Sequence, residues 1–249
     1  PLRGGSLDAD LALRDFTVNA IAEPLEGGDP VDPFGGLQDL AARRLRPVGP
    51  RSFADDPLRV LRLARLSCEL GLHADDDAIA AAREHAAGLE YIAQERVFAE
   101  LKRIVTADAA VAGLQLAERA GALAVVLPEL DALHGVEQTV YHHRDAHGHT
   151  IEVLERAIEI DRDPAAAVGD EHGARVRAVL DEPLADELTR GGALRFGALL
   201  HDIAKARTAV PSPKGGFGFP GHDREGAVMV REILTRLRAS EQLKRHVAE

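Results

Sequence analysis

The most informative stretch of the chain reads Asp55-Asp56-Pro57-Leu58-Arg59-Val60-Leu61-Arg62-Leu63-Ala64-Arg65. Asp56 before Pro57 has the residue types of a helix N-cap and a first helical residue, because a carboxylate accepts the free amide hydrogens there and proline has none to satisfy. The apolar positions that follow recur at helical spacing. We therefore expect a helix that starts at this aspartate and buries its leucines.

Three arginines, Arg59, Arg62 and Arg65, recur on this helix at three-residue spacing and form a narrow basic stripe. The acceptor Asp56 and the donor Arg59, about one turn apart, can together read the hydrogen-bonding edge of a base, and the other arginines can meet phosphate. For the helix viewed alone, solvated surface arginines are the competing interpretation.

The composition favours helices over sheet. The chain has 249 residues, 45% of them hydrophobic but only 4% aromatic, with no tryptophan. This is enough apolar material for one large domain or two to three small ones. Its alanine and leucine content is typical of helices that pack through small side chains. We found no internal repeat. Helices are expected around residues 150–160 and 193–206, and the prolines and glycines of the acidic segment 161–186 indicate mainly exposed connection.

Charge and cysteine content narrow the class further. A formal net charge of -11 argues against nonspecific nucleic-acid binding over the whole surface and leaves room for a local basic groove. The one cysteine, Cys68, excludes an internal disulfide framework. No apolar run approaches the roughly 20 residues that span a bilayer. We expect a cytoplasmic protein with no membrane partner.

Two motifs precede the basic helix. In the segment 13–20, Asp15 and Asn19 are four residues apart and would share a face of a helix, with Arg14 adjacent, so the trio can hold a ribose and a triphosphate; a capped helix start is the alternative. The segment 32–40 contains a Pro-x-Gly-Gly turn, which the sequence alone explains as plain turn chemistry or as a close approach to a ligand.

In order and spacing, these three pieces resemble the class II tRNA nucleotidyltransferase and bacterial poly(A) polymerase family. The similarity includes Glu95-Arg96-Val97-Phe98-Ala99-Glu100-Leu101 and covers nearly the whole chain. It implies that Arg14 and Asp15 contact the sugar and phosphates of the nucleotide. Asp56 with Arg59 would then act as an amino-acid template for the base of ATP or CTP.

The resemblance also sets expectations about metal and completeness. The family's head holds two Mg²⁺ ions on an Asp-x-Asp pair behind a glycine turn; Asp8-Ala9-Asp10 lacks that turn, and Asp10 matches at most a third metal-binding carboxylate. Leu13 replaces the first arginine of the family's pair, and Asp55 replaces glutamate. We expect the catalytic head to be largely absent from this sequence and the chain as given to add no nucleotides.

A second constellation lies in the last hundred residues. His201-Asp202 sits in an apolar stretch, where two polar side chains are costly unless they pair or bind metal. His149 and His222 could join them in a site for Mn, Fe, Co, Ni or Zn; capping and hydrogen-bonded buried histidines are the alternative. The same neighbourhood of the sequence contains three further histidines: His142, His143 and His147.

The order His149, His201-Asp202, His222-Asp223 is similar to the HD phosphohydrolase superfamily, which often closes its site with a later aspartate; no aspartate follows Asp223. The resemblance implies metal-dependent phosphodiesterase or phosphatase activity on 2′,3′-cyclic and 2′-phosphates. A purely structural helical scaffold is the alternative.

These observations predict a mainly α fold: the remnant of an α/β nucleotidyltransferase head in residues 1–50, a nucleotide-selecting and RNA-binding helical neck and body in 51–135, and an HD-like helical domain in 136–249. The expected function is addition of nucleotides from ATP, with or without CTP, to the 3′ end of tRNA or another RNA. The alternatives are an HD phosphohydrolase with an RNA-binding front portion and a noncatalytic RNA-binding body.

Overall fold

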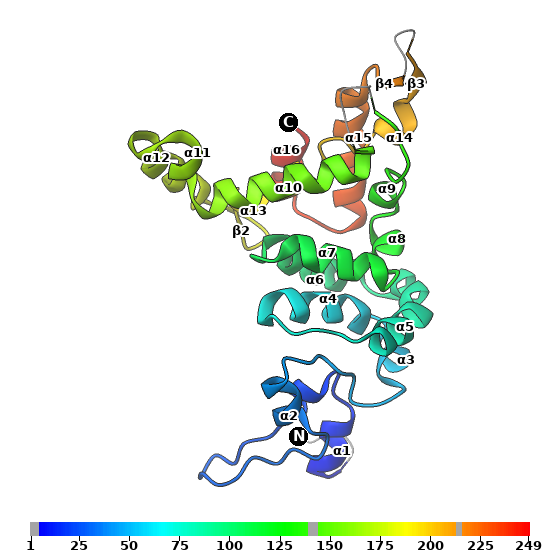
Figure 1. Cartoon of the computed structure of the whole chain (residues 1–249), viewed down its shortest axis with the longest axis vertical. Helices are drawn as coiled ribbons and strands as arrows, with labels where there is room; N and C mark the ends of the chain where they lie inside the picture. Colours follow the sequence, from blue (N-terminus) through cyan, green and yellow to red (C-terminus); the bar gives the residue numbers. More distant parts are fainter. Residues whose placement is uncertain (1–4, 139–143, 213–215) are drawn as a thin grey trace. The chain divides into compact units, whose positions relative to one another are not determined.

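The computed structural model describes residues 5–138, 144–212 and 216–249. The chain forms two compact units, residues 1–126 and 127–249, and each is mainly helical (Figure 1). This confirms the predicted fold class. None of the described helices combines the length and apolarity needed to cross a membrane.

Unit 1 is helical throughout its described elements. They are α1 (Leu7–Ala12), the 3-10 helix η1 (Thr17–Asn19), α2 (Gly36–Ala41), α3 (Ser52–Asp55), α4 (Arg59–Leu70), α5 (Asp76–His85), η2 (Ala86–Tyr91), α6 (Gln94–Thr106), α7 (Ala110–Arg119) and α8 (Ala122–Val126). Helix α4 packs against α6 and α7. The leucines that recur at helical spacing, Leu58, Leu61 and Leu66, are at most 5% exposed, as predicted.

The close packing of α4 on α7 depends on a small residue. A Cβ at Gly113 of α7 would lie 2.9 Å from the sulfur of Cys68 on α4. Cys68 is buried, and burial, with the nearby charge of Glu69, raises the pKa of its thiol to about 11. This cysteine therefore packs, and it is not a reactive nucleophile at neutral pH.

Two groups of buried contacts hold the segment before α3 in place, an aromatic pair and a buried carboxylate. The rings of Phe16 and Phe53 meet edge to face, with 6.2 Å between their centroids. The buried Asp39 of α2 accepts a hydrogen bond from Thr17 Oγ1 (2.6 Å) and ion-pairs with Arg44 and Arg46. At Gly36, an added Cβ would collide with the carbonyl oxygen of Thr17. The glycine at position 36 therefore allows α2 to pack closely against η1.

Unit 2 adds two short antiparallel strand pairs to its helices. Its elements are α9 (Pro128–Asp131), α10 (Ala146–Arg162), α11 (Pro164–Val168), α12 (Asp170–Leu180), β1 (Pro183–Ala185), β2 (Leu188–Thr189), α13 (Arg190–Leu200), α14 (Lys205–Thr208), β3 (Val210–Pro211), β4 (Phe217–Gly218), α15 (His222–Arg236) and α16 (Glu241–Ala248). The long α10 packs on α13, and α15 on α16. Its core includes Leu154, Phe196, Leu199 and Leu234.

Three local expectations need correction. Residues 161–186, interpreted from their prolines and glycines as mainly exposed connection, contain α11 and α12, because Pro164 takes the first helical position and Gly169 (φ 79°) turns the chain between the helices. Helix α4 begins at Arg59, two residues after Pro57, the first helical residue expected from the sequence. The stretch that carries His201 and Asp202 follows the end of α13 at Leu200 instead of lying within one continuous helix.

Candidate functional site

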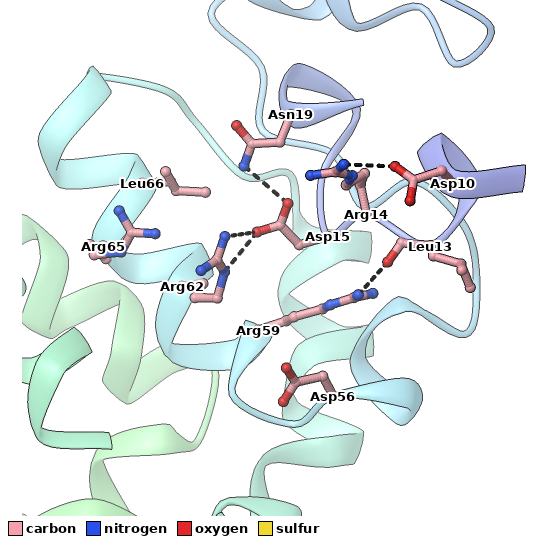
Figure 2. A pocket seen from close by; sticks show the side chains of 10 residues that line it. All are labelled: Asp10, Leu13, Arg14, Asp15, Asn19, Asp56, Arg59, Arg62, Arg65 and Leu66. Carbon is pink, nitrogen blue, oxygen red and sulfur yellow. Dashed lines mark hydrogen bonds and ion pairs between the residues drawn. The ribbon is translucent and has the colours of Figure 1, made fainter. Parts of the chain in front are cut away.

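A polar cleft in unit 1 brings the two predicted nucleotide-binding motifs together. The N-terminal motif and helix α4 face each other across a cavity of about 690 Å³ (Figure 2). It is lined by Asp10, Leu13, Arg14, Asp15, Asn19, Asp56, Arg59, Arg62, Arg65 and Leu66. All eight residues that we assigned from the sequence to nucleotide or metal binding in this region are among them.

Asp15 is the most tightly held carboxylate of this cleft. Its Oδ1 accepts hydrogen bonds from Asn19 Nδ2 (3.0 Å) and from the Phe16 amide (2.8 Å), and its Oδ2 accepts from Arg62 Nε (2.7 Å). Burial favours the neutral form, but the hydrogen bond from Asn19 and the charge of Arg62 outweigh it and lower the pKa of Asp15. Asp15 is thus ionised and fixed in orientation at neutral pH.

Asp15 and Asn19 meet by a different route from the one expected. Their segment is an extended residue, Phe16, followed by the short 3-10 helix η1. The side chains still converge, since Asn19 folds back to bond the carboxylate of Asp15. The spacing of four residues therefore predicted the contact, although the α-helix behind that argument is not there.

Arg59 is fixed by neutral acceptors at the edge of the cleft. Its Nη2 donates to the carbonyl oxygen of Leu13 (2.6 Å), and its Nη1 donates to the carbonyl oxygen and the hydroxyl of Ser52 (3.1 Å each). The Ser52 hydroxyl in turn donates to the carbonyl oxygen of Asp15 (2.7 Å). The guanidinium keeps its charge uncompensated by a carboxylate in these contacts, so it retains its attraction for an anionic ligand.

Asp56 contacts a partner that the sequence argument missed. Its Oδ1 accepts from the Leu58 amide (3.2 Å), and its Oδ2 pairs with Arg96 Nη2 of α6 (2.8 Å). Figure 2 shows Asp56 and Arg59 close together in the cleft, with the dashed contact of Arg59 running to Leu13. Because each carboxylate oxygen can accept two hydrogen bonds, an Asp56 that reads a base could do so while Arg96 holds its orientation.

The basic stripe divides into exposed and buried members. Arg65 is 4% exposed, its Nε lies 2.5 Å from Glu100 Oε2, and its Nη1 lies 2.8 Å from Glu69 Oε2. The second oxygen of Glu100 lies 3.6 Å from Arg62 Nη1. The interpretation of all three arginines as solvated is therefore wrong for Arg65. Its predicted nucleotide role would need it to leave two carboxylates.

Arg14 and Asp10 form the outer rim of the cleft. Arg14 Nη2 lies 2.7 Å from Asp10 Oδ2, and the Arg14 side chain is 53% exposed. Such an exposed pair is weak and readily opened by a stronger anion such as a triphosphate. Asp10 itself is buried near the end of α1.

Three residues near this cleft were given no role from the sequence: Ser52, Arg96 and Glu100. Arg96 and Glu100 lie four residues apart in the family-like motif 95–101. The motif therefore pointed to these two residues but did not predict their contacts with Asp56 and Arg65. Ser52 carries no distinctive local pattern.

In unit 2, the predicted histidines converge on Asp202. His201 Nε2 lies 2.8 Å and His149 Nε2 3.5 Å from Asp202 Oδ2, and His222 Nε2 lies 3.7 Å from its Oδ1. His149 stands in the first turns of α10 and His222 begins α15. We call His149, His201, Asp202 and His222 the HD centre. Asp223 is exposed.

The other histidines do not join this centre in the described part of the chain. His147 is buried and stacks on His134, with ring centroids 3.7 Å apart. His142 and His143 lie outside the described residues.

The donor set of the HD centre fits a divalent metal ion. Donor atoms of His149, His201 and Asp202 all lie within 4.8 Å of one another. Asp202 Oδ2 is buried, and within the described ranges no hydrogen bond of regular geometry reaches it. Imidazole nitrogens with one carboxylate suit the transition metals proposed from the sequence. Burial favours neutral Asp202, but its contacts with His201 and Lys205 outweigh this and lower its pKa to about 2.

Family models match three successive segments of the chain. Residues 3–46 match the poly A polymerase head domain, residues 71–133 match the probable RNA and SrmB-binding site of polymerase A, and residues 147–249 match the HD domain.

Curated relatives carry names that agree with these models. The chain is 37% identical over 242 residues to a multifunctional CCA protein of Halorhodospira halophila, which spans 94% of this chain and 50% of that protein. It is also 37% identical over 239 residues to an A-adding tRNA nucleotidyltransferase of Deinococcus radiodurans, with 94% and 49% covered. The chain thus spans about half the length of the curated relatives it matches.

Solved structures share the fold at low sequence identity. A structure described as a tRNA-processing enzyme in its apo form I superposes with a TM-score of 0.63 at 20% identity, covering 98% of this chain and 53% of that one. The Thermotoga maritima CCA-adding enzyme complexed with tRNA gives a TM-score of 0.54 at 18% identity, with 98% and 57% covered.

The three matches follow one another along the chain as a poly A polymerase head segment, a probable RNA-binding segment and an HD domain. The chain belongs to the tRNA nucleotidyltransferase and poly(A) polymerase family. The resemblance drawn from the sequence motifs is confirmed.

Proposed function

We propose that the protein is an RNA nucleotidyltransferase that adds nucleotides from ATP, with or without CTP, to the 3′ end of a tRNA or another RNA. The observation that carries this proposal is the unit 1 cleft, where Arg14, Asp15 and Asn19 face Arg59 and Arg62 across one cavity. A triphosphate needs concentrated arginine donors, and a base needs a fixed acceptor beside a donor. The cleft offers both within a chain whose net charge is negative.

Each side chain has a distinct part in this proposal. Arg14 meets the phosphates at the exposed rim, and Asp15, oriented by Arg62 and Asn19, accepts a sugar hydroxyl. Arg59 and Asp56 present a donor and an acceptor to the base edge. Arg65 holds Glu100, which in turn lies beside Arg62.

We include Mg²⁺ in this proposal because of the chemistry of the family. Bound Mg²⁺ would neutralise the triphosphate for in-line attack by the RNA 3′-hydroxyl on the α-phosphate. Asp10, at the rim of the cleft, is the residue of this chain that we assign to it. We assign no other residue of this chain to the ion. To bind it, Asp10 Oδ2 would have to exchange its present partner, Arg14.

We also assign residues 1–50 to the head, 51–135 to the neck and body, and 136–249 to the HD-like domain. The succession of the three matched segments supports this order. The two compact units meet at residues 126 and 127, nine residues before the proposed boundary.

Replacing Arg59 tests the template role. In the full-length protein, Arg59→Ala should lower kcat/KM for ATP by about 10- to 100-fold and weaken discrimination among the four nucleoside triphosphates, since a bidentate donor is worth about 1–3 kcal/mol. The measurement is steady-state nucleotide addition to a tRNA acceptor. Arg119→Ala, an exposed arginine of unit 1 paired with Asp76, is the matched control and should leave both quantities unchanged. Unchanged preference and rate in Arg59→Ala would refute the proposal.

The HD centre supports a second candidate activity, metal-dependent hydrolysis of phosphodiesters or phosphomonoesters. The observation in its favour is the convergence of three imidazoles on one buried carboxylate. Hydrolysis of a 2′,3′-cyclic phosphate, measured with added Mn²⁺ or Ni²⁺ before and after His201→Ala, separates this activity from nucleotide addition.

A further inference from the structure

Lys205 introduces a cation into the HD centre that neither candidate activity assigns. It begins α14, three residues after Asp202, and it is 8% exposed. Its Nζ lies 2.6 Å from Asp202 Oδ2, and it donates a hydrogen bond of 2.6 Å to Gln138 Oε1. The ring of Phe219 lies below it, with 5.3 Å from Nζ to the ring centroid.

The contact with Asp202 is one of charge. The distance is short, but the angle is not that of a regular hydrogen bond, which goes instead to Gln138. A buried ammonium is costly unless a counter-charge lies beside it. Among the described residues, Asp202 is the carboxylate that forms an ion pair with Lys205. The two side chains therefore depend on each other for neutralisation.

The same carboxylate oxygen is the one that a metal ion would use. Asp202 Oδ2 is the oxygen that faces the Nε2 atoms of both His149 and His201. An ammonium 2.6 Å from this oxygen and a divalent cation bound to it would repel each other strongly in a buried setting. Metal binding and the Lys205–Asp202 contact thus compete for one charge.

We infer that Lys205 is a built-in counter-cation of the HD centre, which neutralises Asp202 without metal and weakens the binding of divalent ions by competing for Asp202 Oδ2. Unit 2 then needs no metal to fold, unlike small domains whose folding energy comes from their ion. The inference does not depend on nucleotide addition or on hydrolysis, since it concerns affinity and stability alone.

Metal titration of the 249-residue chain tests the competition. Lys205→Met keeps most of the length and volume of the side chain but removes its charge. This variant should bind Mn²⁺ at least about 10-fold more tightly than the unchanged chain, measured by isothermal titration calorimetry with the metal alone. Lys205→Arg keeps the charge and should leave the affinity within a few-fold. Arg207→Met, an exposed residue of the same helix, is the matched control and should have no effect. His201→Ala added to Lys205→Met should abolish the gain, which places the ion at this centre.

Thermal unfolding supplies an independent measurement. The unchanged chain should melt at the same temperature with EDTA and with Mn²⁺ at low concentration, whereas Lys205→Met should melt lower in EDTA and recover with Mn²⁺. Lys205→Gln, a polar neutral replacement, repeats the test if the methionine variant unfolds in EDTA.

The inference is overturned if folded Lys205→Met binds Mn²⁺ no more tightly than the unchanged chain. It is equally overturned if EDTA abolishes cooperative melting of the unchanged chain. Failure of excess Mn²⁺ to restore both neutral variants would also overturn it, because a metal ion would then be unable to replace the ammonium.

Discussion

Two buried carboxylates, Glu100 of unit 1 and Asp202 of unit 2, have basic neighbours that differ in whether their charge depends on pH. Glu100 holds Arg65 and lies near Arg62, whereas Asp202 faces His149, His201, His222 and Lys205. Guanidinium groups keep their charge at every physiological pH, but imidazoles lose theirs near neutrality.

This difference separates a permanent electrostatic scaffold from an adjustable one. The arginines of unit 1 can be arranged once, by the fold, and then present fixed donors to a triphosphate. The histidines of the HD centre are metal ligands when neutral and cations when protonated, so the state of that centre depends on pH and on the ions present.

The largest expected effect follows from removing each carboxylate's charge. Glu100→Gln should destabilise unit 1 by about 3–5 kcal/mol, because Arg65 would remain charged and buried without its main partner. Asp202→Asn should destabilise unit 2 less, although it leaves Lys205 without its counter-charge, because the imidazole neighbours can be neutral and a buried lysine, unlike an arginine, can give up its proton. Urea unfolding of each variant measures both changes. Equal losses, or a larger loss at Asp202, would contradict the distinction between the two centres.

The sequence predicted the members of each centre better than their pairing. Arg59, Arg62 and Arg65 were found by spacing along one helix, and Asp15 with Asn19 by a separation of four. The partners Arg96 and Glu100 are 40 and 35 residues away from Asp56 and Arg65. Their contacts arise when α4 packs on α6, and spacing along one helix says nothing of them.

The missed helices α11 and α12 show a second limit. Pro164 and Gly169 have the composition of a loop, but one initiates a helix and the other separates two. Gly173 of α12 packs so closely on Ala165 of α11 that a Cβ would approach its Cα within 2.7 Å. Gly173, which by composition indicates a break in a helix, is therefore required by the contact between the two helices.

An intermediate effect concerns Asp15 and pH. Burial opposes the lowered pKa of Asp15, but the hydrogen bond from Asn19 and the charge of Arg62 prevail. A depressed pKa means that the ionised form stabilises the folded state above the ordinary value of 3.8, and that this contribution is lost as the pH falls through the folded-state pKa. Asp15→Asn should therefore cost on the order of 1–3 kcal/mol near neutral pH.

The cost of Asp15→Asn should shrink as the pH falls below 3.8, where the unfolded chain takes up a proton at Asp15, and should shrink further as the pH falls through the lower pKa of the folded state. Urea unfolding at pH 7, 5 and 3.5 measures it. Asp29→Asn, at an exposed position, is the control. A cost that does not depend on pH would show that the charge of Asp15 is not what stabilises its contacts.

The smallest effect on stability is expected at Arg96, where a change in selectivity should accompany it. Its side chain is 53% exposed, so Arg96→Ala should lower the free energy of unfolding by at most about 1 kcal/mol. It should nevertheless change the ratio of ATP to CTP use in the full-length protein by several-fold, because Asp56 Oδ2 would lose the partner that orients it toward the cleft. Arg96→Lys, which retains the charge, should restore part of that ratio.

Arg103→Ala is the matched control for this change, since Arg103 lies on the same helix α6, is 56% exposed and pairs with Glu69 outside the cleft. It should alter stability as little as Arg96→Ala and leave nucleotide selection as it was. If the two variants behave alike, Arg96 is one more surface ion pair. If they differ in selectivity but not in stability, an exposed arginine positions a template carboxylate, a role that neither its burial nor its contribution to the fold would reveal.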